Sequence, residues 1–99
     1  MASLRRYAGE ELATRSEVRE AILIGSLAQD NWSARSDADI VLIVEASHER
    51  GPLRGAGYAP RRPVGVAVDV LVYTPEEATR WGPRFRAEVE AGVGLYRRA

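Results

Sequence analysis

The pattern that most constrains the fold is a glycine–serine pair, Gly25-Ser26, followed after ten residues by two spaced aspartates, Asp37 and Asp39. The second aspartate runs directly into the apolar segment 40–44, which consists only of Ile, Val and Leu. A continuous apolar run of this kind, rich in β-branched residues, is typical of a buried strand. The pattern therefore predicts a strand that begins with acidic side chains and lies in the interior of a sheet.

A third acid, Asp69, lies alone inside another apolar run, residues 64–72. An isolated carboxylate is costly to remove from water, so it is usually neutralised, paired with a cation or bound to a metal ion. Three aspartates converging from two strands, Asp37, Asp39 and Asp69, therefore indicate a site for a divalent metal ion.

Length and composition are those of one soluble globular domain, residues 1–99. The chain is 45% hydrophobic and 28% charged, and a domain of this size buries about 65% of the surface of its unfolded chain. Basic and acidic residues balance at 14 each. With no overall field to attract polyanions, we expect neither a nucleic-acid nor a membrane partner.

The residue types that are missing exclude several chemistries. All basic residues except the single histidine are Arg, so a Walker-type phosphate loop and a Schiff-base lysine are excluded. Without Cys there are no disulfides, thiol nucleophiles or cysteine zinc sites. His48 lies in a polar stretch and is expected in a solvated loop. No apolar segment approaches the roughly 20 residues of a membrane span and no signal peptide is visible, so we expect a cytoplasmic protein.

The remaining patterns predict an alternation of helices and strands. Thr74 with Pro75 is a strong helix start, because Thr caps and Pro suits the first helical position. Gly82-Pro83 ends that helix. The segment 47–63 is rich in Gly, Pro and Arg and is expected to be an irregular connection. The expected elements are helices at 3–16, from Thr74 and at 84–91, and strands at 21–24, 38–45, 64–73 and 95–98.

Strand periodicity indicates how the acids can meet. Asp37 and Asp39 are two residues apart and point to the same face, whereas Ala38 and Ile40 point to the opposite face, where a helix layer would cover them. If strands 38–45 and 64–73 are neighbours, Asp69 can approach the pair. Hard oxygen ligands of this kind favour Mg²⁺ or Mn²⁺, which act on phosphate oxygens.

The Gly25-Ser26 turn supplies groups suited to phosphate. Glycine lets the backbone come close to a ligand, amides at the start of a following helix point at anions, and the Ser26 hydroxyl can donate to a phosphate oxygen. Each part also has a purely structural interpretation: a Gly-Ser pair as a simple turn, an Asp-x-Asp as loop solvation, and Asp69 as a strand-end cap. Their conjunction favours a site for a nucleoside triphosphate.

The spaced motif Gly25-Ser26 and Asp37-Ala38-Asp39 resembles the signature of the nucleotidyltransferase superfamily built on the DNA polymerase beta-type core. The segment Val68-Asp69-Val70-Leu71 resembles the strand that carries the third carboxylate of that family. In size the chain is similar to the minimal nucleotidyltransferases that are often encoded beside a HEPN-domain protein. The resemblance implies an α/β (α+β) fold with a polymerase beta-like palm, that is, a short mixed sheet with helices on one face.

The resemblance also implies roles for the motif residues. Gly25 and Ser26 would bind the nucleotide, Asp37 and Asp39 would bind Mg²⁺ or Mn²⁺, and Asp69 would complete the metal site and help to deprotonate the acceptor hydroxyl. All three aspartates would be catalytic. The implied reaction is transfer of AMP from ATP, with pyrophosphate as the leaving group.

The acceptor implied by the resemblance is brought by a partner. In similar systems the minimal enzyme adenylylates a tyrosine of the HEPN toxin, and the pair can form an oligomer. Two other functions stay open: a non-catalytic antitoxin that acts by binding its partner, and a nucleotidyltransferase that modifies a small molecule.

One pair of residues departs from the family pattern. Family members commonly carry Arg-Gly shortly after the Gly-Ser pair, where this chain has Gln29-Asp30. The change removes an arginine that can contact phosphate and adds a negative charge, while the three aspartates are retained.

Overall fold

The computed structural model describes residues 2–25, 38–45, 55 and 57–98. None of the helices in these ranges is long and apolar enough to cross a membrane. In chain order the elements are α1 (Ala2–Tyr7), the π-helical segment η1 (Ala8–Leu12), β1 (Val18–Ile24), β2 (Ala38–Val44), β3 (Val68–Tyr73), α3 (Pro75–Ala78), α4 (Pro83–Glu90) and β4 (Val93–Arg97).

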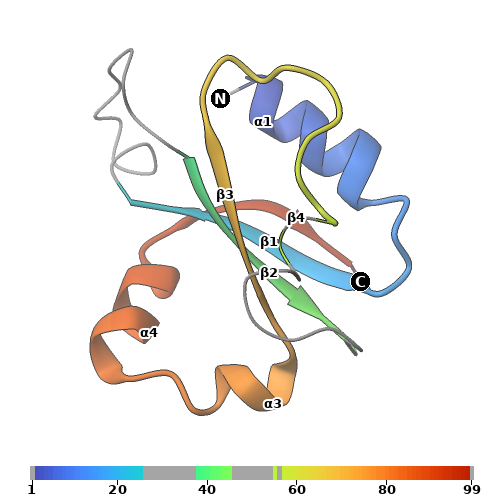
Figure 1. Ribbon diagram of the computed structural model, residues 1–99. Coiled ribbons are helices and arrows are strands. Elements are labelled where there is room, and N and C mark those ends of the chain that lie inside the picture. Colours follow the sequence, from blue (N-terminus) through green and yellow to red (C-terminus); the bar gives the residue numbers. More distant parts are fainter. Residues whose placement is uncertain (1, 26–37, 46–54, 56, 99) are drawn as a thin grey trace.

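The four strands form one sheet in the order β3-β2-β1-β4 (Figure 1). β1 pairs antiparallel with both β2 and β4, whereas β2 and β3 run parallel. The predicted mixed sheet is therefore confirmed, and the two strands that carry the predicted aspartates are neighbours. The expected C-terminal edge strand is β4, which begins two residues before the predicted segment 95–98.

One face of the sheet is covered by α1 and η1. Leu4, Tyr7 and Leu12 from this helical layer are buried against residues of β1 and β2 such as Leu23 and Leu42. The alternate residues of β2, beginning with Ala38, point into this cluster, as strand periodicity predicted. Their burial is the main source of stability, because each fully buried large apolar side chain contributes about 1.5–3 kcal/mol.

The opposite face carries helices as well, so the prediction of helices on one face only is corrected. Val89 of α4 packs with Ile22, Ile24 and Val41 in a second buried cluster. The segment from α3 to α4 lies across the sheet from α1 (Figure 1). This second layer follows from the chain order: β3 ends at Tyr73 and α3 begins at Pro75. From there the chain continues along the face opposite to α1, where residues of α4 pack on the sheet.

The helix start at Thr74 has the predicted chemistry. The Thr74 hydroxyl accepts a hydrogen bond from the Glu77 amide at 3.2 Å, and the Thr74 amide donates to the Glu77 carboxylate at 2.9 Å. This reciprocal capping box satisfies backbone donors that a helix terminus otherwise leaves free. It fixes the direction in which the chain leaves β3.

Two elements are shorter than predicted. The helix expected over 3–16 ends at Leu12 with a π-type turn, in which the Ala13 amide donates to the Ala8 carbonyl at 2.9 Å. The strand expected from residue 64 begins at Val68. The reason lies in Gly65, whose φ of 85° belongs to the left-handed region and is incompatible with a strand.

In the long connection Gly55 is helical, whereas residues 57–63 are irregular as predicted. Residues 57 and 58 are tied to the first helical layer. The Tyr7 hydroxyl donates to the Tyr58 carbonyl, and burial, followed by the nearby Glu11 carboxylate, raises the pKa of Tyr7 well above its ordinary value, with Arg15 opposing. The Arg15 guanidinium donates to the Gly57 carbonyl at 2.6 Å and lies 4.9 Å from the centre of the Tyr58 ring. These contacts hold residues 57 and 58 against the N-terminal helical layer.

Gly92, between α4 and β4, lies so close to β1 that it has no room for a side chain. A Cβ atom there would lie 2.7 Å from both Ile22 Cγ2 and the Leu23 carbonyl oxygen. We expect Gly92→Ala to lower the free energy of unfolding by about 1–3 kcal/mol, because overpacking forces the sheet and helix apart. Gly94→Ala in β4 is the control, since a Cβ there meets nothing within 4 Å. Urea denaturation curves that coincide for the two variants would contradict this packing.

Candidate active site

The structure brings Asp39 and Asp69 side by side. They are Cα partners in the parallel register of β2 and β3, so both side chains project from the same face of the sheet. This is the face opposite to α1, as the side-chain alternation required. The N-terminal ends of two adjacent parallel strands thus carry one carboxylate each.

The two carboxylates differ in exposure, which corrects the expectation that both lie in buried strands. Asp39 is half-buried in the interior strand β2, whereas Asp69 is exposed. The apolar run around Asp69 predicts a buried strand, but β3 is the edge of the sheet. The Asp69 carboxylate therefore remains hydrated and does not require a metal ion to offset a cost of burial.

Gly25 completes this part of the site from β1. Its predecessor Ile24 is the Cα partner of Asp39, and Gly25 itself has a φ of 84°, a left-handed conformation that favours glycine. A Cβ atom on Gly25 would lie 3.2 Å from Asp39 Oδ2. The glycine thus follows directly after the end of β1 and also leaves space beside the carboxylate.

Two of the predicted site residues, Ser26 and Asp37, lie outside the described residues, as do His48 and Gln29-Asp30. Among the residues that the structure describes, no group of three or more acidic or histidine side chains is close enough to hold a metal ion. The pair Asp39 and Asp69, with Gly25 beside it, is the part of the predicted site that is placed.

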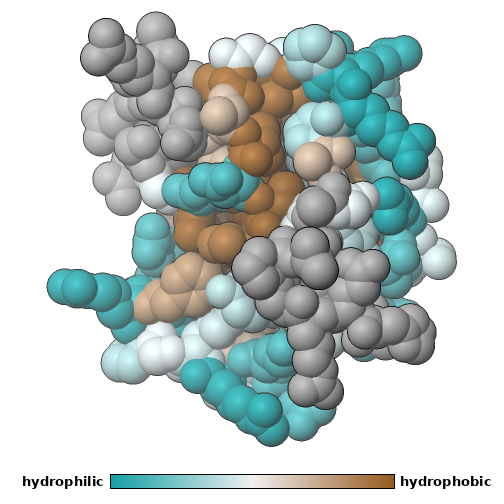
Figure 2. Space-filling view, in the orientation of Figure 1, coloured by the Kyte–Doolittle hydropathy of each residue, from teal (hydrophilic) through white to brown (hydrophobic). Residues whose placement is uncertain are grey.

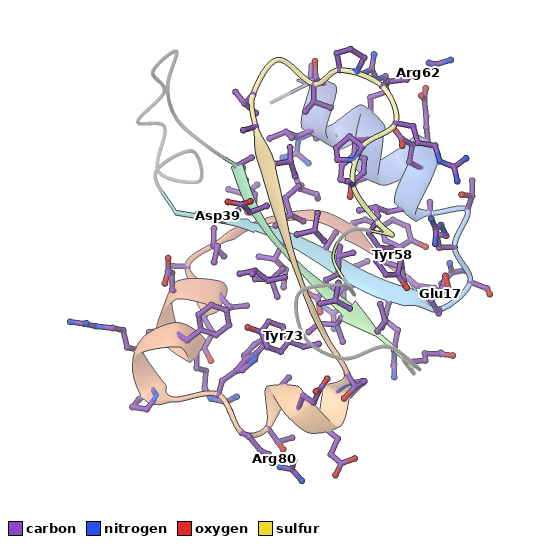
Figure 3. All side chains as sticks on the ribbon, viewed as in Figure 1. Glu17, Asp39, Tyr58, Arg62, Tyr73 and Arg80 are labelled. Carbon is purple, nitrogen blue, oxygen red and sulfur yellow. The ribbon has the colours of Figure 1, made fainter. Side chains whose placement is uncertain are left out.

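An aromatic cluster that the sequence interpretation missed occupies the other end of the same face. The ring of Trp81 meets Tyr73 and Phe85 edge-to-face, with centroids 5.2 and 5.1 Å apart. Figure 3 shows Tyr73 toward α3 and α4 and Asp39 away from them. The predicted break at Gly82-Pro83 is confirmed, because α3 ends at Ala78 and α4 begins at Pro83. Trp81 and Phe85 lie on either side of this break, so no local periodicity indicated that they would pack together. The cluster anchors the second helical layer and leaves the aspartate end of the face uncovered by the described helices.

A family model described as a nucleotidyltransferase domain matches residues 6–97. The chain therefore belongs to the nucleotidyltransferase domain family.

The fold has a solved counterpart. The crystal structure of a protein from Sulfolobus solfataricus, provisionally assigned as a nucleotidyltransferase, superposes with a TM-score of 0.65. The match covers 98% of this chain and 79% of that one at 20% sequence identity. At this identity the match shows a shared fold. A comparison with curated proteins finds no match.

Proposed function

We propose that this nucleotidyltransferase domain transfers AMP from ATP to a tyrosine hydroxyl of a partner HEPN-domain protein, as the antitoxin of a toxin–antitoxin pair. The observation that carries the proposal is the pairing of Asp39 with Asp69 on adjacent strands, with Gly25 against the Asp39 carboxylate. The family match supports nucleotidyl transfer in general. The choice of AMP and of a protein acceptor is the proposal.

The carboxylates fit the divalent ion that such a reaction uses. Two aspartates on one face present hard oxygen donors, which suit Mg²⁺ or Mn²⁺ better than softer metals. Asp37, two residues before Asp39 in the sequence, is the third proposed ligand. When bound, the ion would neutralise triphosphate charge and stabilise the in-line displacement.

The chain's own residues would bind the triphosphate and move the proton. Gly25 leaves room for a phosphate group beside Asp39, and the Ser26 hydroxyl would donate to a phosphate oxygen. Asp69 would accept the proton of the tyrosine hydroxyl while the tyrosine oxygen forms a bond to the α-phosphorus. The bond from that phosphorus to the bridging oxygen breaks, and pyrophosphate leaves.

The exposure of Asp69 supports a large acceptor. A carboxylate on the outermost strand can be reached by a side chain of another protein without opening the fold. A partner that supplies its own tyrosine would need no further pocket in this domain.

The test is an incubation of the chain with ATP, Mg²⁺ and the HEPN-domain protein, followed by the intact mass of that protein. We expect a gain of one AMP on a tyrosine, which disappears when that tyrosine is replaced by Phe. An unchanged mass of the HEPN-domain protein would contradict the proposal. Equal neutralisation of the toxin by the Asp39→Asn variant would instead indicate an antitoxin that acts by binding, and turnover of a small molecule without the partner would indicate a self-contained enzyme.

A further inference from the structure

We propose that a pocket between the sheet and the α3–α4 layer binds a small organic cation with an aromatic body, at a site separate from Asp39 and Asp69. The pocket has a volume of about 480 Å³. The inference goes beyond the proposed function and does not rest on nucleotidyl transfer, because binding in the pocket is measured without ATP. It adds a second ligand site to the face of the sheet opposite to α1.

The pocket lies on the same face of the sheet as Asp39 but at the other end. Ile22 of β1 and Ile43 of β2 line it, and both belong to the apolar cluster on this face. Ile43 follows Asp39 by four residues in β2, which corresponds to about 13 Å along a strand. A ligand that rests on these two isoleucines is therefore not at the acid pair.

The hollow exists because the chain at the start of β4 offers no side chain to this face. Gly92 and Gly94 both line the pocket. Gly94 is the Cα partner of Ile22, and a Cβ atom on Gly94 would meet nothing within 4 Å. The space that a side chain of β4 would otherwise fill is therefore open.

The volume is that of a site for a small molecule. A cavity of about 150 Å³ holds one benzene molecule, and pockets for small ligands are usually about 300–1,000 Å³. At about 480 Å³ this pocket has room for a molecule with at least two rings. That space is more than a single arginine or lysine side chain of a partner protein would fill.

The wall formed by α3, α4 and the segment between them is apolar and includes an aromatic ring. Ala78, Val89 and Trp81 line it, and the Trp81 ring is held edge-to-face by Tyr73 and Phe85. Trp81 Nε1 is buried, with no hydrogen-bond partner in the part of the chain that the structure describes, so the pocket meets carbon atoms of the ring. Aromatic rings of this kind attract organic cations.

Two carboxylates give the pocket a negative charge. Glu20 is half-buried on β1 and Glu90 is the last residue of α4, and no basic residue of the described ranges lines the pocket. Neither glutamate forms an ion pair with a described residue, not even Glu20 with Arg97, its Cα partner in β4. The C-terminal end of α4 adds the negative end of the helix dipole. A positively charged ligand complements this surface.

A different apolar surface has to be distinguished from the pocket. Figure 2 shows an apolar band that follows β3 on the molecular surface. No residue of β3 lines the pocket. An apolar ligand that binds to this band would therefore change the amide signals of β3 and leave those of Ile22 and Gly94 unchanged.

The probes are three molecules that share an indole body: the cation tryptamine, the neutral tryptophol and the anion indolepropionate, each titrated into ¹⁵N-labelled chain. We expect tryptamine at millimolar concentrations to shift the amide signals of Glu20, Ile22, Ile43 and Gly94. It should bind about tenfold or more tighter than indolepropionate. Equal binding of these two probes, shifts confined to β3, or no shifts with tryptamine would overturn the proposal.

Filling the pocket is the second arm. Gly94→Leu should weaken tryptamine binding about tenfold or more, because the new side chain occupies the open space. Gly9→Leu, which also adds a side chain where a Cβ atom meets nothing but lies outside the pocket, is the control. If Gly94→Leu does not fold, Ala78→Leu narrows the pocket from α3 and should weaken binding in the same way. Undiminished binding in a folded pocket variant would refute the site.

Neutralising the carboxylates is the third arm. In Glu20→Gln/Glu90→Gln, which keeps the shape of both side chains, tryptamine and tryptophol should bind equally. Glu88→Gln, on α4 but outside the pocket, should keep the preference for tryptamine. An unchanged preference in the double variant would refute a site for a cation.

Two other occupants would be recognised in the same titrations. Tighter binding of the peptide acetyl-Ala-Arg-Ala-amide than of tryptamine at these signals would indicate an arginine of a partner protein. Shifts of the pocket signals on dilution of the chain alone would indicate a second copy of the chain. Either result would overturn the assignment to a small cation.

Discussion

Replacing Asp39 with Asn is expected to lower the rate of nucleotidyl transfer by about 10²-fold or more, because it removes the charge of a proposed metal ligand while keeping its shape. The side chain is half-buried between β1 and β3, and its partner across the ladder is Asp69. An amide of the same size preserves packing, so the sheet should remain folded. The measurement is the initial rate of transfer from α-labelled ATP at saturating Mg²⁺, with thermal unfolding of the same sample.

The control for this prediction is Glu88→Gln, which makes the same chemical change at an exposed position of α4. It should keep the wild-type rate. If Asp39→Asn and Glu88→Gln transfer at equal rates, Asp39 does not take part in the reaction.

Gly25→Ala is expected to lower the transfer rate about tenfold or more, because the added methyl group would displace the Asp39 carboxylate. The new Cβ would lie 3.2 Å from Asp39 Oδ2, which forces the carboxylate to move, and small displacements of reacting groups are costly. The variant should also lose about 1–2 kcal/mol of stability, because φ at this position is 84°.

Gly65 provides a matched control for the backbone effect. Its φ is 85°, and a Cβ there would meet nothing within 4 Å. Gly65→Ala should therefore lose a similar free energy of unfolding and keep its transfer rate. Equal losses of rate in the two variants would show that strain, and not contact with Asp39, is responsible.

More of the arrangement of Asp39 within its strand than of the structure around it could be predicted from the sequence. The apolar runs of β1 and β2 are interior strands and were recognisable, and two-residue periodicity correctly placed Asp39 opposite to Ala38 and Ile40. The meeting of Asp39 with Asp69 depended on strand order, which local patterns do not specify. A parallel neighbour needs a long crossover, and the chain between β2 and β3 was recognised as a long connection without a defined path.

What the sequence could not show was the exposure of each strand. β3 has the apolar composition of an interior strand but lies at the edge of the sheet, and Val64 and Val66 before it are only partly buried, beside the irregular segment 57–63. That segment is held by contacts of Tyr7, Arg6 and Arg15 with backbone carbonyls distant in sequence. Every residue has a backbone carbonyl, so the sequence does not indicate which carbonyl will accept such a hydrogen bond.

The central claim, that Asp39 and Asp69 beside Gly25 hold the metal ion of a nucleotidyl-transfer site, is tested most directly by Mn²⁺ in a ¹⁵N-labelled sample with a non-hydrolysable ATP analogue. Paramagnetic broadening should be strongest at the amides of these three residues and should be lost in the Asp39→Asn/Asp69→Asn variant. Broadening centred on another part of the molecule, or undiminished by the double substitution, would contradict the account.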